Sequence, residues 1–196
     1  MTRFLALGDS YTIGEAVPPD DAWPNLIATR LGVAGPQIIA KTGWTTDELD
    51  AAIDDARPEP PFDLVTLLIG VNDQYRGRSA EEYRPKFTAL LRRAIGFAGD
   101  EPRRVVVVSI PDWGVTPFAA GRDGRGIAVE IDAFNRMNRD ESRKAETRYV
   151  DVTHASRELA SDPSMHAFDG LHPSAAMYRR WADLIISEAR DALAIR

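Results

Sequence analysis

The run LVTLLI, residues 64–69, decides the fold of this chain. It is apolar on both faces, as a strand with helices on both sides of its sheet should be, and such strands are typical of parallel sheets. The run VVVVSI, residues 105–110, has the same character. Shorter apolar runs predict three more strands, at residues 4–7, 37–40 and 149–152.

Apolar residues recur at helical spacing between and after these strands, which predicts helices. Asp20 or Asp21 is expected to cap the first helix. Thr45 and Glu48 form a capping box before the second helix, and Pro85 is expected to kink the third or to delay its start. The expected helices cover residues 23–31, 49–56, 83–94, 127–134 and 174–195.

Five strands that alternate with helices imply βαβ units. The sequence therefore predicts one α/β domain over residues 1–196, a three-layer α/β/α sandwich around a five-stranded parallel sheet. Its longest irregular stretch, residues 112–125, follows the fourth strand. A loop of that length is uncommon without a role, and its aromatic residues predict a pocket wall or a lid.

Composition excludes several classes of function. The net charge is −6, from 30 acidic and 24 basic side chains, which gives no electrostatic reason to expect nucleic acid as a partner. The chain has no cysteine, and so no disulfide, thiolate metal site or cysteine nucleophile. The apolar N-terminal stretch is too short for a signal peptide, and no run approaches the roughly 18 apolar residues of a membrane span. A soluble, cytoplasmic protein is therefore expected, and no heptad repeat indicates its oligomeric state.

Residues with chemical potential follow the ends of the predicted strands. Ser10 follows the first strand, Gly43 the second, Asn72 the third, and the loop with Trp113 the fourth. In an open parallel sheet, ligands bind at the carboxyl ends of the strands. These four positions are therefore expected to meet at one rim of the sheet.

Ser10, in GDSYT, is a candidate nucleophile that needs a base within hydrogen-bond reach. His172, in DGLHPS, is the candidate base, because Asp169 can fold back in a tight turn and accept its Nδ1 proton. Taken separately, each piece also fits an ordinary turn: a capped strand end, or a helix entry with a surface histidine. The other two histidines, His154 and His166, are expected in loops or at the surface.

Asn72, in IGVND, and Gly43, in TGWTT, are candidates for stabilising a developing oxyanion. Asparagine amides and backbone N–H groups are the usual donors for this task in acyl transfer. A glycine has no Cβ, so its N–H can approach a substrate closely. Both residues also fit simple turns after buried strands.

Four blocks of the sequence resemble those of the SGNH hydrolases, the subdivision of the GDSL esterase/lipase family named for Ser, Gly, Asn and His. The blocks occur in the family's order, as GDSYT, TGWTTDEL, GVND and DGLHPS, across nearly the whole chain. The resemblance implies a flavodoxin-like three-layer fold and hydrolysis of esters or thioesters without a metal or cofactor. It places Ser10, His172 and Asp169 in a catalytic triad. It places the N–H groups of Ser10 and Gly43, with the Asn72 side chain, in an oxyanion hole.

The expected function is thus a serine esterase that cleaves small-molecule carboxylic esters through an acyl-enzyme. Short acyl or acetyl groups are favoured, because the chain has no large insertion to build a lipase lid. Carbohydrate O-acetyl ester or thioester hydrolysis on the same triad is the alternative. Tyr11 stands where the family motif has leucine, which puts only the substrate fit in doubt. Aromatic residues near the rim are candidates for lining an apolar pocket, or for packing against the core: Tyr11, Trp44, Tyr75, Trp113 and Phe118.

Two hypotheses of other classes stand beside the esterase. A metal-dependent phosphohydrolase would use Asp9, Asp73 and Asp169, which lie near the same predicted rim and have the carboxylates that Mg²⁺ prefers. Against it, the chain lacks a phosphate-cradling glycine loop, and Asp9 and Asp73 fit turn-stabilising acceptors equally well. A non-catalytic binding module on the same scaffold is the third hypothesis, since fold does not dictate function.

Overall fold

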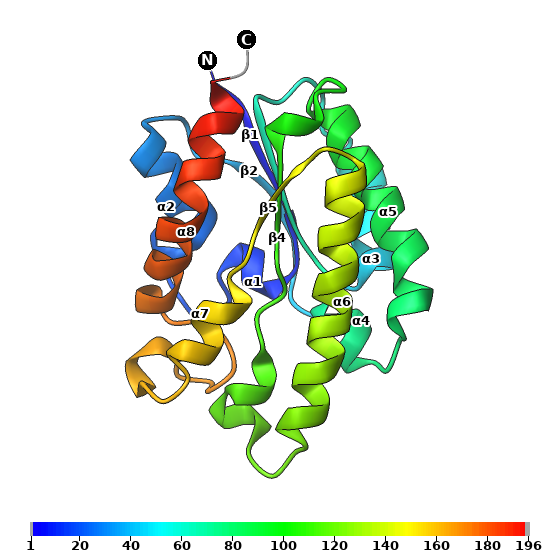
Figure 1. Ribbon diagram of the computed structural model, residues 1–196. Coiled ribbons are helices and arrows are strands. Elements are labelled where there is room, and N and C mark those ends of the chain that lie inside the picture. The colour runs from blue at the N-terminus through cyan, green and yellow to red at the C-terminus, as the bar shows by residue number, and fades with distance from the viewer. Residues whose placement is uncertain (1, 195–196) are drawn as a thin grey trace.

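The computed structural model describes residues 2–194 and has a fully parallel five-stranded sheet at its centre (Figure 1). The strand order is β2-β1-β3-β4-β5, so β1 and β3 lie side by side in the middle. The strands are β1 (Phe4–Gly8), β2 (Gln37–Ala40), β3 (Leu64–Leu68), β4 (Val105–Val108) and β5 (Arg148–Val150). The chain reverses its winding direction between β1 and β3, and open α/β sheets bind ligands at such a switch point.

Helices cover both faces of the sheet, which confirms the predicted three-layer α/β/α sandwich (Figure 1). One layer holds α2 (Trp23–Leu31) and α8 (Ala175–Leu193), and the other holds α3 (Thr46–Ala56), α5 (Ala80–Phe97) and α6 (Gly124–Lys144). Three short helices follow strands closely: α1 (Ser10–Ile13), α4 (Val71–Tyr75) and α7 (Thr153–Glu158). Single 3-10 turns are formed by Pro19–Asp21, Pro102–Arg104, Trp113–Val115, Pro117–Ala119 and Pro163–Met165.

The core lies between the central strands and the two helix layers. β1, β3 and β4 are buried along their whole length, which explains why their sequences are nearly continuous apolar runs. The largest fully buried side chains come from the helices and include Trp23, Trp181, Tyr83, Tyr178 and Phe87. Close packing of this kind gives the strand ends a rigid base from which side chains can be positioned.

The expected cap of the first helix and the expected effect of Pro85 on the start of the third differ from the structure. The expected cap of the first helix, Asp20 or Asp21, is wrong, because both residues belong to a separate 3-10 turn and α2 begins after Ala22. Pro24 lies in the first turn of α2, where its missing N–H has no partner to lose. Pro85 does not delay its helix either, since α5 runs without a break from residue 80 to residue 97.

Other boundaries agree more closely. The Thr45–Glu48 capping box is present, with Thr45 N donating to Glu48 Oε2 at 2.7 Å. The loop expected at residues 112–125 contains two 3-10 turns before α6 begins. His154 is exposed at the surface, as one of its two expected placements had it, and lies in α7. The last helix ends at Leu193, and Ile195, where its end was expected, lies outside the described residues. Among residues 2–194, no helix is long and apolar enough to cross a membrane.

Candidate active site

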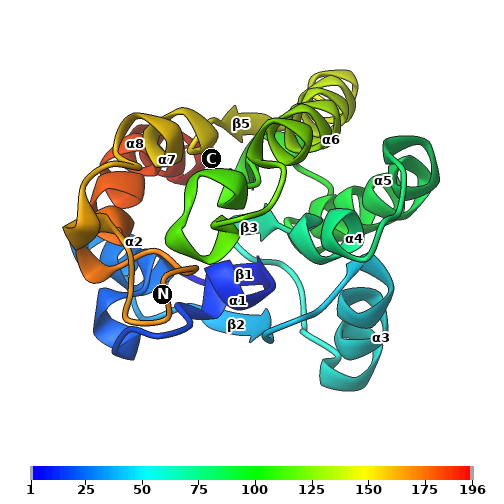
Figure 2. The same ribbon diagram turned by 90° about the horizontal axis from the view of Figure 1, so that it is seen from below.

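The carboxyl ends of the strands meet at the lower edge of the sheet, which Figure 2 shows from below. Ser10 begins α1 and Asn72 lies in α4, while Gly43 and His172 lie in the segments that lead into α3 and α8. These four residues line one cavity of about 220 Å³. Trp113, from the loop after β4, lines it too. The structure therefore brings together the four positions that the sequence places at a common rim, and His172 lies with them.

Ser10 is held at the end of β1 by its neighbours in sequence. The Asp9 side chain caps α1 by accepting a hydrogen bond from Tyr11 N at 3.0 Å. A Cβ on Gly8 would lie 2.4 Å from the carbonyl oxygen of Leu68 and closer still to the Thr12 side chain. Gly8 is therefore needed because other atoms approach it closely, and not because the chain turns there.

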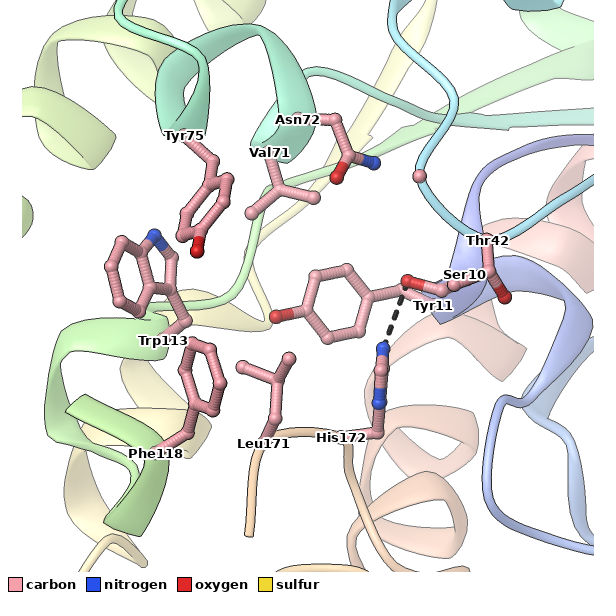
Figure 3. A pocket seen from close by; sticks show the side chains of 11 residues that line it. Ser10, Tyr11, Thr42, Val71, Asn72, Tyr75, Trp113, Phe118, Leu171 and His172 are labelled. Carbon is pink, nitrogen blue, oxygen red and sulfur yellow. Dashed lines mark hydrogen bonds between the residues drawn. The ribbon is translucent and has the colours of Figure 1, made fainter. Parts of the chain in front are cut away.

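His172 lies between the serine and the acid, and Figure 3 shows its ring turned toward Ser10. Its Nε2 lies 3.0 Å from Ser10 Oγ, and its Nδ1 lies 2.6 Å from Asp169 Oδ2. The other Asp169 oxygen accepts hydrogen bonds from the backbone N–H groups of Leu171 and His172, at 2.9 Å and 3.0 Å. A tight turn thus holds the carboxyl group behind the imidazole.

The charge of Asp169 determines which nitrogen of His172 carries the proton. Partial burial alone would raise the pKa of the Asp169 carboxyl, but hydrogen bonds from His172 and from the backbone of the turn outweigh it and lower the pKa. An ionised carboxylate can only accept, so Nδ1 of His172 must donate to it. In a neutral imidazole, Nε2 is then an acceptor that faces the Ser10 hydroxyl. The site therefore has a base positioned to take the serine proton.

Gly43 lines the same cavity and has a φ angle of +85° that favours glycine. A Cβ there would meet only Arg76 Nη2, at 3.9 Å, so conformation and not crowding requires a glycine. Arg76 Nη2 donates to the Gly43 carbonyl oxygen at 2.6 Å, and Asn72 Nδ2 donates to the Trp44 carbonyl oxygen at 2.9 Å. Two side chains from α4 and its end thus hold the Gly43 turn.

Two backbone donors remain available at this rim. The N–H groups of Ser10 and Gly43 have no acceptor within residues 2–194, and the Asn72 amide has a second N–H besides the one given to Trp44. Ser10, Gly43 and Asn72 all line the cavity. Donors arranged in this way are suited to stabilising negative charge on a carbonyl oxygen.

An aromatic wall formed by Tyr75, Trp113 and Phe118 bounds the cavity on the side away from His172 and Ser10 (Figure 3). Trp113 is buried and its Nε1 donates to Gln74 Oε1 at 2.8 Å, whereas Tyr75 is 49% exposed and Phe118 is 39% exposed. Neighbouring rings pack edge-on or tilted, with centroids 5.4 Å and 6.1 Å apart. The cavity thus has a polar end at the serine and an apolar end at the wall.

The loop that carries the wall is joined to the loop that carries the acid and the base. The backbone N–H of Phe118 donates to the carbonyl oxygen of Gly170 at 2.9 Å, and Gly170 directly follows Asp169. Tyr11, another expected pocket residue, lines the middle of the cavity between the wall and His172 (Figure 3) and places its ring edge-on to His172, with centroids 5.6 Å apart. The loop that carries Trp113 and Phe118 is thus bonded to the segment that holds the acid and the base.

Trp44 is the one expected pocket residue that does not line the cavity, since its side chain packs against the core. Sequence reasoning also missed three residues that do line it, namely Thr42, Val71 and Leu171. Each of them directly precedes Gly43, Asn72 or His172 in the chain. Adjacency to a motif residue is the signal that could have identified them.

The three aspartates of the phosphohydrolase hypothesis have separate partners. Asp73 is buried and accepts hydrogen bonds from Thr46 N and Thr46 Oγ1 and an ion pair from Arg78. Burial raises the pKa of Asp9 to about 8, and Asp169 is bonded to His172. Within residues 2–194, no group of three histidine or acidic side chains has the spacing of a metal site. These acids therefore support the positions of other residues.

A parallel α/β/α fold with a serine, histidine and acid at its switch point defines a class of hydrolytic enzymes. The model of the GDSL-like lipase/acylhydrolase family matches residues 6–180, and the chain belongs to that family. It is thus an SGNH/GDSL-type hydrolase, as its four sequence blocks predict. A curated relative, an arylesterase of Vibrio mimicus, is 29% identical over 120 residues. That match covers 57% of this chain and 58% of the relative.

Solved structures of similar fold cover nearly the whole chain. TesA has a TM-score of 0.76 at 20% identity, with 98% of this chain and 100% of that chain covered. Phospholipase A1 from Streptomyces albidoflavus NA297 has a TM-score of 0.77 at 19% identity, with coverage of 96% and 99%. The acetylxylan esterase Axe2 from Geobacillus stearothermophilus has a TM-score of 0.71 at 19% identity, with coverage of 96% and 94%. At this level of identity the likeness establishes the fold.

Proposed function

We propose that this protein is a serine esterase in which Ser10 is the nucleophile, His172 the general base and Asp169 the group that orients the base. The observation that carries the proposal is the 3.0 Å contact between Ser10 Oγ and His172 Nε2, with Asp169 hydrogen-bonded to the far nitrogen. A serine becomes nucleophilic when a base lies within hydrogen-bond reach and is itself oriented by a third group.

The reaction begins when Ser10 Oγ attacks the ester carbonyl carbon and its proton passes to His172 Nε2. The carbonyl oxygen becomes an oxyanion, which the N–H groups of Ser10 and Gly43 and the Asn72 amide stabilise. Collapse of the intermediate breaks the bond to the alcohol oxygen, which takes the proton from His172 and leaves. A water molecule then gives a proton to His172 and attacks the acyl carbonyl carbon. Collapse of this second intermediate breaks the bond to Ser10 Oγ, which takes the proton back from His172, and the acid leaves.

We assign carboxylic esters with short acyl or acetyl groups as substrates, because the cavity of about 220 Å³ is small for a drug-sized ligand. Acetyl esters of carbohydrates and thioesters are the alternative substrates for the same residues. The acetylxylan esterase among the solved structures supports the first of these, and the arylesterase relative supports simple aryl esters. A panel of p-nitrophenyl esters of increasing chain length, run beside acetylated xylose and a thioester, separates these classes.

Replacement of Ser10 tests the mechanism directly. The Ser10→Ala variant is expected to lose nearly all ester turnover, and a fluorophosphonate should label the wild-type serine but not the variant. Labelling should also fall strongly in a His172→Ala variant, because Ser10 then has no base in contact with its hydroxyl. Near-native turnover by Ser10→Ala would end the proposal. Loss of wild-type turnover with a chelator would instead favour the metal-dependent phosphohydrolase.

A further inference from the structure

Arg122 lies against all three rings of the aromatic wall. Its guanidinium carbon is 4.9 Å from the ring centroid of Phe118, 5.5 Å from that of Trp113 and 5.7 Å from that of Tyr75. A guanidinium within about 6 Å of a ring centroid is attracted by the negative face of the ring. One side chain therefore contacts residues from α4 and from both 3-10 turns of the loop at residues 112–123.

Two of the three rings of the wall are only partly covered by the rest of the protein. Trp113 is buried and hydrogen-bonded to Gln74, but Tyr75 and Phe118 are each more than one-third exposed. Arg122 is itself exposed, and within residues 2–194 its guanidinium makes neither an ion pair nor a hydrogen bond. Its charge is therefore not neutralised by a carboxylate, and the rings are its main partners.

We propose that Arg122 is a positioning residue that holds the aromatic wall together and thereby sets the preference of the cavity for esters that carry a flat apolar group, such as a phenyl ring. The proposal rests on the proposed ester hydrolysis. When an ester is bound at Ser10 and its phenyl group reaches the wall, the ring can pack edge-on or offset against Tyr75 and Phe118. The methyl of an acetyl group attached to Ser10 has much less surface to offer the wall.

The test compares two esters in the wild type and in Arg122→Ala. The ratio of kcat/KM for ethyl benzoate to that for ethyl acetate is expected to fall about three- to tenfold in the variant, mainly through KM. Phenyl acetate, measured in parallel, shows whether the wall receives the acyl or the alcohol group. Arg122→Lys keeps a cation and should recover part of the ratio, whereas Arg122→Gln should not. Arg125→Ala, an exposed arginine three residues along the chain, is the matched control and should keep the wild-type ratio.

A binding measurement separates this proposal from the esterase mechanism. In a Ser10→Ala background, the Kd of ethyl benzoate should rise about three- to tenfold relative to that of ethyl acetate when Arg122 is also replaced by alanine. If the wild type cleaves no ester, the mechanism fails while the binding ratio still reports on Arg122. An unchanged ratio in both the kinetic and the binding experiments would overturn the role of Arg122, whatever the mechanism. Equal losses with Arg122→Lys and Arg122→Gln would also overturn it.

Discussion

The Arg76 guanidinium and the Gly43 carbonyl oxygen are joined by a 2.6 Å hydrogen bond. Gly43 has a left-handed backbone, and its N–H faces no acceptor within the described residues 2–194. Asn72 holds the next carbonyl along the chain, that of Trp44. Two side chains, Arg76 and Asn72, thus hold the turn that presents a candidate oxyanion donor. Asn72 belongs to one of the four sequence blocks, whereas Arg76 belongs to none of them.

Replacing Arg76 by alanine should lower kcat for p-nitrophenyl acetate about tenfold and leave KM within about twofold. In the proposed mechanism, a displaced Gly43 N–H weakens a contact made only with the oxyanion, and small displacements near the reacting atoms are costly. Steady-state kinetics measure both constants. Arg92→Ala removes another exposed arginine and should behave as the wild type. An Arg76→Ala enzyme with unchanged kcat would show that the turn holds its shape without this bond.

Asp169→Asn should reduce kcat by roughly 10³–10⁴ while the protein remains folded. An amide can donate to Nδ1, so it no longer forces the proton onto that nitrogen and no longer stabilises the imidazolium. Hydrolysis of p-nitrophenyl acetate measures the loss, and the thermal midpoint checks the fold. Asp162→Asn is a suitable control, because Asp162 also accepts hydrogen bonds in a tight turn but lies outside the cavity. Similar losses in the two variants would point to a general effect of removing a turn carboxylate.

The buried Asp9 carboxyl should make the protein less stable as pH rises. Burial raises its pKa to about 8 from an ordinary value near 3.8, so between these values the folded chain holds a proton that the unfolded chain has released. Stability therefore falls as pH rises through this window, by up to about 1.4 kcal/mol per pH unit from this group.

Urea unfolding at pH 5, 6 and 7 measures this effect when the wild type is compared with Asp9→Asn. The amide cannot ionise, so the free energy of unfolding of the variant should fall less steeply with pH than that of the wild type. Other titrating groups are common to both proteins and cancel in the difference. A wild-type minus variant difference that stays constant from pH 5 to pH 7 would show that Asp9 is ionised throughout.

Gly8→Ala should destabilise the protein by roughly 1–3 kcal/mol or more and also lower esterase activity. The added methyl would lie 2.4 Å from the Leu68 carbonyl oxygen, so β1 or β3 must shift beneath Ser10. Gly96→Ala is the matched control, because a Cβ there meets nothing within 4 Å and alanine favours a helix. The control should be neutral or stabilising by up to about 1 kcal/mol in urea unfolding. Equal stability of the two variants would contradict the close approach at Gly8.

The sequence predicts the parts of this site that depend on local order. Ser10, Gly43 and Asn72 each follow a strand closely, so the rule that parallel strands end at one edge is enough to bring them together. The turn from Asp169 to His172 is equally local. The strands themselves could also be located from local sequence, because buried strands are short, continuously apolar runs.

Contacts between residues that are far apart in the sequence could not be predicted in this way. Arg122 lies in an exposed loop, and nothing in its neighbourhood of the sequence indicates contact with Tyr75, which precedes it by more than forty residues. Nothing in the sequence around Arg76 indicates its contact with the Gly43 turn either. The raised pKa of Asp9 follows from complete burial, whereas the sequence indicates only that the residue lies beside a strand end. The choice left open for Trp44, between lining the cavity and packing against the core, could not be made from the sequence, because a turn residue does not reveal which way its side chain points.

The backbone bond between Phe118 and Gly170 has a consequence for protein engineering. Any redesign that moves the Phe118 backbone to admit a bulkier ester pulls on the residue next to the carboxylate that orients His172. Libraries that vary this segment should therefore yield clones whose selectivity and turnover change together. Side-chain changes that leave the main chain in place offer the better route to altering one without the other.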